Sequence, residues 1–235
     1  MGLLSCVMFS KLKEIERISL RKYTIGMENI PANAIQSIFP AAITVGSFAL
    51  LQYAVITWSG EKSVYALLTG LVYKGFEGTG NGFLSALLYT VLVHVLWVLG
   101  FHGSHMLETV ALDNFSAVGE NIVFSKSFFD TFVMMGGCGT TICVLLGIFI
   151  FARKKRMRNL GKIALPTVIF NSNEILNFGI PIMLNPVLAI PFVCVPIMAL
   201  MVSYGATVLG LVPCVTQEIS WTMPIIFSGY LSLIH

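Results

Sequence analysis

The chain has 235 residues, of which 56% are hydrophobic and only 11% are charged, and its formal net charge is +3. Because soluble domains carry about 25% charged residues, this composition excludes an ordinary soluble domain and predicts an integral membrane protein. The basic residues cluster beside apolar segments and form no groove, so we expect no nucleic-acid partner. The five cysteines form no C-x-x-C pair, which argues against a disulfide framework or a zinc site. We expect neither a metal nor a cofactor.

The N-terminal 31 residues are mixed in character, and we separate them from the membrane-embedded domain expected over residues 32–235. An apolar run from Gly2 to Phe9 precedes the first lysines, whereas the charges of a cleaved signal peptide come first, so we exclude a signal peptide. Residues 10–31 fit either short strands or an amphipathic helix at the membrane surface, and their pattern does not decide between the two.

The remaining chain predicts an all-α integral membrane protein with transmembrane helices, an amphipathic interfacial helix and re-entrant helical hairpins. A helix of about 20 apolar residues crosses a bilayer. The interfacial helix is expected over residues 61–76, a loop over residues 108–127, and a further, partly embedded segment over residues 216–235. The predicted spans are Asn33–Trp58, Phe83–Phe101, Phe128–Ala152 and a long or kinked Pro181–Val212.

Residues 153–162, RKKRMRNLGK, are the densest positive cluster of the chain and directly follow the third predicted span. Cytoplasmic loops of membrane proteins carry an excess of Lys and Arg. We therefore place this cluster on the cytoplasmic side.

The stretch from Pro166 to Pro186 is apolar but contains one carboxylate, Glu174, together with several asparagines and helix breakers. An ionisable group at bilayer depth costs about 2.5–3.5 kcal/mol on insertion scales and usually marks a functional site. Broken helices are tolerated there only where the backbone is buried in protein or lines a cavity. We predict a re-entrant hairpin over residues 164–180 that carries a polar substrate site.

A first polar cluster, His102, His105 and Glu108, follows the second predicted span. The two histidines are three residues apart and would share one face of a helix. Three interpretations are open for this cluster. The histidines could bind a metal, although no further ligand stands out. They could be helix-end histidines held by hydrogen bonds, or they could belong to a site of proton or phosphoryl transfer.

The second cluster is Asn171, Asn173, Glu174 and Asn177. A buried carboxylate beside amides can bind sugar hydroxyls and act as a general base. The alternative is a structural glutamate that accepts backbone hydrogen bonds at a helix start.

A third candidate is Trp221, whose ring can stack on a sugar. Tryptophan is also common at membrane interfaces whatever the function of the protein, and the sequence leaves both interpretations open.

In the order of these three clusters, the chain resembles the sugar permease subunit, enzyme IIC, of bacterial phosphotransferase systems, specifically the lactose/cellobiose/diacetylchitobiose family. The specific segments are WVLGFHGSH (97–105) and FNSNEILNFGIPIMLNPVLAIPF (170–192). Three more support them by order and spacing: NIPANAIQSIFPAAITVGSF (29–48), MMGGCGTTICVLLG (134–147) and WTMPIIFSGYL (221–231). The resemblance covers the chain from about residue 15 onward.

The resemblance implies that Glu174 and His102 form the catalytic pair at the 6-hydroxyl of the sugar, the group that becomes phosphorylated. It also implies that residues 32–235 form a substrate-binding (transport) domain. The substrate-binding set would comprise Asn173, Trp221, Asn171 and His105.

The partners implied by the resemblance are a β-linked disaccharide of cellobiose, lactose or chitobiose type and a cytoplasmic enzyme IIB that carries a phosphocysteine. The phosphoryl-carrying residue lies on IIB and not on this chain, so whether the chain counts as an enzyme stays open. The resemblance further implies a homodimer in the full-length family and a multi-pass protein of the bacterial cell membrane.

Two departures from the family pattern bear on these expectations. Ile175 stands where family members usually have proline. Family members are also longer at both ends, so we expect a truncated or split gene product with an incomplete C-terminus. Two alternatives to the permease function stay open. The chain could be a non-transporting remnant or a split subunit that needs a partner chain, or it could be an ion-coupled secondary transporter.

Overall fold

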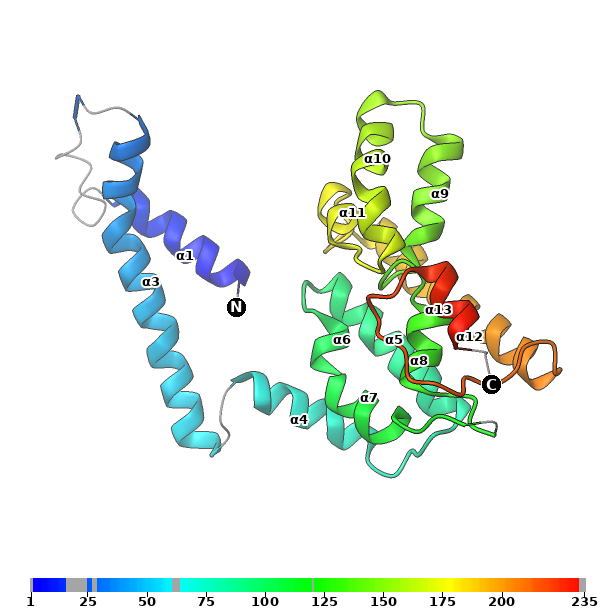
Figure 1. Cartoon of the computed structure of the whole chain (residues 1–235). Helices are drawn as coiled ribbons and strands as arrows, with labels where there is room; N and C mark the ends of the chain where they lie inside the picture. The colour runs from blue at the N-terminus through cyan, green and yellow to red at the C-terminus, as the bar shows by residue number, and fades with distance from the viewer. Residues whose placement is uncertain (1, 16–24, 27–28, 61–63, 120, 233–235) are drawn as a thin grey trace. The chain divides into compact units, whose positions relative to one another are not determined.

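The computed structural model describes residues 2–15, 25–26, 29–60, 64–119 and 121–232, and these residues form helices joined by turns and loops, without a strand (Figure 1). They divide into two compact units, residues 1–70 and 71–235. The all-α class is confirmed. The choice between strands and a helix over residues 10–31 is settled only in part, because α1 runs to Glu14 and residues 16–24 lie outside the described residues. The domain boundary expected at residue 31 stays a prediction.

The first unit contains α1 (Gly2–Glu14) packed against the long helix α3 (Asn29–Ser59). Within α3, residues 32–59 are long and apolar enough to cross a membrane, which confirms the first predicted helix. Pro40 interrupts the hydrogen bonding inside α3 because it has no N–H, and the Thr44 hydroxyl donates to the Pro40 carbonyl at 2.7 Å. Most side chains of this helix are exposed, which suits contact with lipid.

The second unit begins within α4 and is built around the packing of α5 against α12. Aromatic side chains fill its core: the rings of Tyr89, Phe115 and Phe129 lie 4.9–5.5 Å apart, at distances typical of favourable aromatic pairs. The elements in chain order are α4 (Val64–Phe76), α5 (Phe83–Val98), α6 (Gly103–Met106), α7 (Glu108–Phe115), α8 (Lys126–Phe128), the π-helix η2 (Phe129–Val133), α9 (Thr141–Phe151), α10 (Lys155–Ile169), α11 (Glu174–Gly179), α12 (Pro186–Val208) and α13 (Ile225–Leu231).

The third predicted span is wrong, because residues 128–152 do not form one helix. The π-helix η2 ends at Val133, and a glycine-rich loop over residues 134–140 separates it from α9. Gly136, Gly137 and Gly139 all have positive φ angles, which glycine adopts readily and which continue no right-handed helix. The loop expected over residues 108–127 is also wrong in part, since it contains α7.

The two other predicted spans and the hairpin are found as helices with changed limits. The second span becomes α5 and ends at Val98. The fourth becomes α12, the second helix long enough to cross a membrane, and it begins only at Pro186. The Asn185 side chain accepts the Val187 N–H at 3.1 Å and so caps the start of α12. The break expected near Glu174 is present between α10 and α11.

The short helix α6 lies so close to α5 that only glycine fits at its first position. A Cβ atom on Gly103 would lie 2.0 Å from the Val93 carbonyl oxygen, which belongs to the backbone of α5 and has no room to move. This close approach fixes the position of α6 and therefore of the two histidines on either side of Gly103.

We expect Gly103→Ala to destabilise the second unit by about 1–3 kcal/mol, because the added methyl group must push α6 away from α5. The measurement is the thermal unfolding midpoint of the purified chain in detergent. The matched control is Gly205→Ala in α12, where a Cβ atom meets nothing within 4 Å and alanine favours the helix. Equal midpoints for the two variants would contradict this account of Gly103.

Candidate functional site

A cavity of about 150 Å³ opens in the second unit and is lined by five separate parts of the chain. All six site residues expected from the sequence lie on its wall, together with residues that the sequence did not single out. The lining residues are Tyr89, Trp97, His102, Ser104, His105, Glu108, Lys126, Asp130, Met134, Gly137, Cys138, Asn171, Asn173, Glu174 and Trp221. The structure thus brings the three polar clusters of the sequence together.

His102 occupies the turn between α5 and α6, held between two other rings. Its ring centre lies 4.6 Å from that of Trp97 and 4.1 Å from that of His105. The Ser104 hydroxyl is 3.2 Å from His102 Nδ1, within hydrogen-bond distance. His105 Nδ1 in turn lies 3.8 Å from a carboxylate oxygen of Glu108. These contacts fix the orientation of the His102 imidazole at the cavity wall.

The charge state of His102 follows from its surroundings. Burial lowers the pKa of His102, the neighbouring His105 lowers it further, and the carboxylate of Glu174 partly offsets both effects. An unperturbed histidine titrates near pH 6.5, so the lowered pKa leaves His102 neutral at pH 7. A neutral imidazole can donate a hydrogen bond from one nitrogen and accept one at the other.

Asn171 occupies the break between α10 and α11 and ties two distant loops to it. Its backbone is left-handed, with φ of 59°, which asparagine tolerates better than most residues. Its side-chain oxygen accepts the N–H of Gly136 at 2.8 Å, and its amide nitrogen donates to the carbonyl of Trp221 at 2.9 Å. The Asn171 side chain and the Gly136 backbone are both buried, so the first of these bonds satisfies an N–H group that has little access to water.

Asn173 makes the second tie between this break and the glycine-rich loop. Its amide donates to the carbonyl of Cys138 at 2.7 Å. The two segments touch so closely that a Cβ atom on Gly137 would lie 2.8 Å from the Asn171 carbonyl oxygen and from Asn173 Cβ. Both asparagines therefore hold the backbone of the site, and the contact with substrate expected for them stays a prediction.

Glu174 is the first residue of α11, and its carboxylate lines the cavity together with those of Glu108 and Asp130. The Ser172 hydroxyl donates to one of the Glu174 oxygens at 2.5 Å, which leaves acceptor capacity on the carboxylate. Glu174 lies close enough to His102 for its charge to act on that imidazole. The arrangement places a fixed hydrogen-bond acceptor beside a neutral imidazole.

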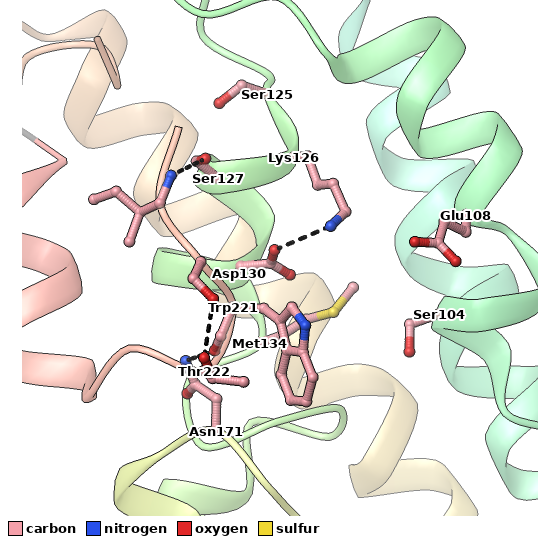
Figure 2. Close-up of polar contacts among 12 residues, drawn as sticks. Ser104, Glu108, Ser125, Lys126, Ser127, Asp130, Met134, Asn171, Trp221 and Thr222 are labelled. Carbon is pink, nitrogen blue, oxygen red and sulfur yellow. Dashed lines mark hydrogen bonds and ion pairs between the residues drawn. The ribbon is translucent and has the colours of Figure 1, made fainter. Parts of the chain in front are cut away.

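The remaining wall carries Trp221 and an ion pair that the sequence did not indicate. The Trp221 side chain is half exposed, and Trp221 lines the cavity together with Met134 (Figure 2). Nζ of Lys126 lies 4.0 Å from a carboxylate oxygen of Asp130. Two polar residues four positions apart within an apolar run were the only sequence signal for this pair.

No group of three or more His, Cys, Asp or Glu side chains within the described ranges is placed to hold a metal ion. The cavity instead combines the carboxylates of two glutamates, two imidazoles, amides, the Lys126–Asp130 ion pair and two indole rings. This mixture of polar groups and aromatic faces is suited to a polyhydroxylated ligand.

Comparison with known proteins gives consistent results. Residues 1–196 match the family model described as Phosphotransferase system, EIIC. The chain is 34% identical to the lichenan permease IIC component of Bacillus subtilis (strain 168), over 82% of this chain and 48% of the relative. It is 29% identical to the oligo-beta-mannoside-specific EIIC component of the same organism, over 90% of this chain and 51% of the relative. The chain spans about half the length of these curated relatives.

A solved structure is similar over almost the whole chain. It is the transporter ChbC, the IIC component from the N,N'-diacetylchitobiose-specific phosphotransferase system, with a TM-score of 0.61 and 28% identity. The match covers 98% of this chain and 56% of the solved one.

The Asn171 side chain can be tested by two substitutions that differ in backbone strain. Asn171→Gly keeps the left-handed conformation but leaves the buried Gly136 N–H without this partner, at a cost of about 1–3 kcal/mol, and it also removes the bond to the Trp221 carbonyl. Asn171→Ala loses the same bonds and adds about 1–2 kcal/mol of left-handed strain. We expect thermal unfolding in detergent to rank stability as wild type, then Asn171→Gly, then Asn171→Ala. An alanine variant as stable as wild type would contradict this role.

Proposed function

Because this chain belongs to the phosphotransferase system EIIC family, we propose that it binds a β-linked disaccharide of cellobiose, lactose or chitobiose type in the cavity of the second unit and moves it inward for phosphorylation at the 6-hydroxyl. The observation that carries the proposal is that His102, Glu174 and Trp221, which come from distant parts of the sequence, all line one cavity. The names of the similar proteins support the class of sugar.

The residues of the cavity have distinct roles in this proposal. The Trp221 ring stacks on one face of a sugar, as indole rings do with apolar ring faces. Glu174 accepts a hydrogen bond from the 6-hydroxyl, and neutral His102 donates to or accepts from the same group. Asn171 and Asn173 keep the loops that carry these side chains in place, and their amides border the sugar. His105 orients His102 and extends the polar wall.

The transfer step takes place with a separate enzyme IIB. The oxygen of the 6-hydroxyl attacks the phosphorus of a phosphocysteine on IIB, an oxygen–phosphorus bond forms, and the sulfur–phosphorus bond breaks. The proton of the hydroxyl goes to Glu174, and the cysteine leaves as a thiolate. Positioning and electrostatics carry most of such a transfer, which agrees with a site whose side chains are held by hydrogen bonds.

The proposed setting is a multi-pass protein in the bacterial cell membrane that forms a homodimer, with residues 32–235 as its transport domain. The basic residues at the turn between α9 and α10 are mostly exposed and support a cytoplasmic position for that turn. Phospho-IIB would approach from the same side.

Two other functions would give different results in sugar-binding and uptake experiments. A subunit that needs a partner chain would bind sugar only after that chain is added. An ion-coupled secondary transporter would take up sugar without any phosphoryl donor.

We expect Glu174→Gln to weaken the binding of radiolabelled cellobiose to the purified chain in detergent by about tenfold or more, because hydrogen bonds to a charged group contribute about 1.5–3 kcal/mol. In the presence of phospho-IIB, the rate of sugar phosphorylation should fall by about 10²–10⁴-fold, the usual contribution of a general base.

The matched control for this variant is Glu77→Gln, an exposed glutamate that does not line the cavity. It should leave both quantities unchanged. Saturable cellobiose binding that is equally strong in Glu174→Gln and wild type would show that Glu174 does not contact the sugar.

The lowered pKa of His102 predicts how sugar binding depends on pH. The neutral imidazole is the binding form, and the lowered pKa keeps it neutral below the ordinary histidine value of about 6.5. Cellobiose affinity should therefore stay constant from about pH 8 to about pH 6.5 and fall only at lower pH. In His102→Gln, which cannot titrate, the part of the decline due to His102 should disappear. A loss of affinity in wild type already between about pH 7.5 and 6.5 would contradict a neutral His102 of lowered pKa.

A further inference from the structure

The hairpin of α9 and α10 carries a dense group of cations that the proposed sugar site does not use. The two helices pack against each other, and the group begins directly after α9 and runs into the first half of α10 (Figure 1). All of its members are exposed. They are Arg153, Lys154, Lys155, Arg156, Arg158 and Lys162, which we call the basic cluster.

Carboxylates that could compensate this charge are absent from its sequence neighbourhood. The sequence has no Asp or Glu between Asp130 and Glu174, and both of these line the main cavity. Among the residues that the structure describes, no ion pair involves a member of the basic cluster. Neighbouring cations without a counter-charge repel one another, so a bound anion lowers the electrostatic energy of this end of the hairpin.

Part of the basic cluster forms a stripe along one side of α10. Lys155, Arg158 and Lys162 follow the spacing i, i+3 and i+7, which places them on the same face of the helix. The residues that α10 buries, among them Ala164 and Val168, lie on the opposite side. Because each helical residue rises 1.5 Å, the stripe is about 10 Å long. It is therefore an exposed, purely cationic surface of the size of a lipid headgroup.

Arg158 is held in place at the middle of this stripe. Its Nε donates to the carbonyl of Ala152, the residue that ends α9, at 2.9 Å. A guanidinium has five N–H donors in a planar fork, so the others are available for phosphate oxygens, which such a fork binds well. Lys155 and Lys162 on either side can add charge-assisted hydrogen bonds. A phosphate thus meets an oriented arginine between two lysines.

Exposed apolar side chains adjoin the basic cluster on both helices. Ile150 and Phe151 at the end of α9 are 66% and 78% exposed, and Ile163, next to Lys162, is 64% exposed. A soluble phosphate would bind the cations alone, whereas a lipid also covers these side chains with its acyl chains. Because α9 is apolar over its whole length and the family consists of membrane permeases, lipid is the neighbour that this surface fits.

We propose that the basic cluster is a binding site for an anionic phospholipid, with the headgroup phosphate between Lys155, Arg158 and Lys162 and the acyl chains along the exposed apolar side chains of α9 and α10. The inference needs the membrane setting of the chain but not the sugar site. It therefore stands or falls separately from the proposed binding and phosphorylation of sugar.

The helix α10 connects this lipid site to the main cavity. It ends two residues before Asn171, in the break that leads to Glu174. Leu160, between Arg158 and Lys162, packs so closely on the end of α11 that a Cβ atom on Gly179 would collide with its side chain. A lipid bound to the stripe therefore anchors the helix that holds one wall of the main cavity.

The test measures lipid binding to the whole purified chain in detergent by native mass spectrometry. The probes are dioleoylphosphatidylglycerol and dioleoylphosphatidylcholine, which share their acyl chains, and only the first has a net negative charge. Wild type should bind phosphatidylglycerol about tenfold more tightly or better, because each basic residue near an anionic headgroup contributes about fivefold in affinity. Salt raised from about 50 mM to about 500 mM should reduce this preference by screening.

A double variant tests the stripe itself. Lys155→Gln combined with Lys162→Gln should weaken phosphatidylglycerol binding by about tenfold or more and leave phosphatidylcholine binding unchanged. The matched control combines Lys11→Gln in α1 with Lys74→Gln in α4, two exposed lysines whose replacement removes the same charge. This control should keep the preference of wild type.

Equal affinity of wild type for the two lipids, as expected of a surface for an acidic protein, would overturn the inference. An equal loss of phosphatidylglycerol binding in the two double variants would also overturn it. Displacement of the lipid by glycerol 3-phosphate at millimolar concentration would show that the cluster binds a free phosphate and not a lipid. The comparison in wild type needs no variant, so it decides the question even where a variant does not fold.

Discussion

The candidate site depends on one constraint. Where a helix breaks inside the protein, backbone N–H and C=O groups lose their helical hydrogen bonds and must find other partners within the protein. The described chain meets it through two asparagine side chains. Asn171 joins the break between α10 and α11 to the glycine-rich loop and to the segment of Trp221, and Asn173 joins it again to Cys138. Without these bonds the broken helices would leave several buried groups unpaired, at about 1–3 kcal/mol each. The same bonds bring residues from distant parts of the sequence to one cavity.

This arrangement explains how a polar site is held within a largely apolar protein. Glu174 lies at the start of a short helix, its carboxylate accepts a hydrogen bond from Ser172, and its charge acts on His102, which remains neutral at pH 7. Because His102 is neutral, Glu174 and His102 can bind a hydroxyl with only one charged group between them, which limits the desolvation cost of this pair. The positions of the histidines depend in turn on the close contact of Gly103 with α5. Packing between helices and hydrogen bonding between loops therefore act together on the same few side chains.

The sequence predicted the helical class better than it predicted the helix limits, and the six residues that it singled out for a site line one cavity. His102 and Glu174 were singled out because ionisable groups are costly in apolar sequence, and that cost does not depend on tertiary structure. Trp221 was singled out for a ring that can stack on a sugar. Residues 128–152 were expected to form one helix because hydropathy does not register the positive φ angles of three glycines. Lys126 and Asp130 were missed because a single pair of charged residues is indistinguishable in sequence from a solvated helix face. The ties made by Asn171 and Asn173 join residues 35 to 50 positions apart, which local patterns do not reveal.

The most direct test of the central claim is an experimental structure of the purified chain with bound cellobiose. The account predicts density for a disaccharide inside the main cavity, with one ring stacked on Trp221 and a 6-hydroxyl within hydrogen-bond distance of Glu174 and His102. A disaccharide bound elsewhere on the chain, with the main cavity empty at saturating sugar, would contradict the account.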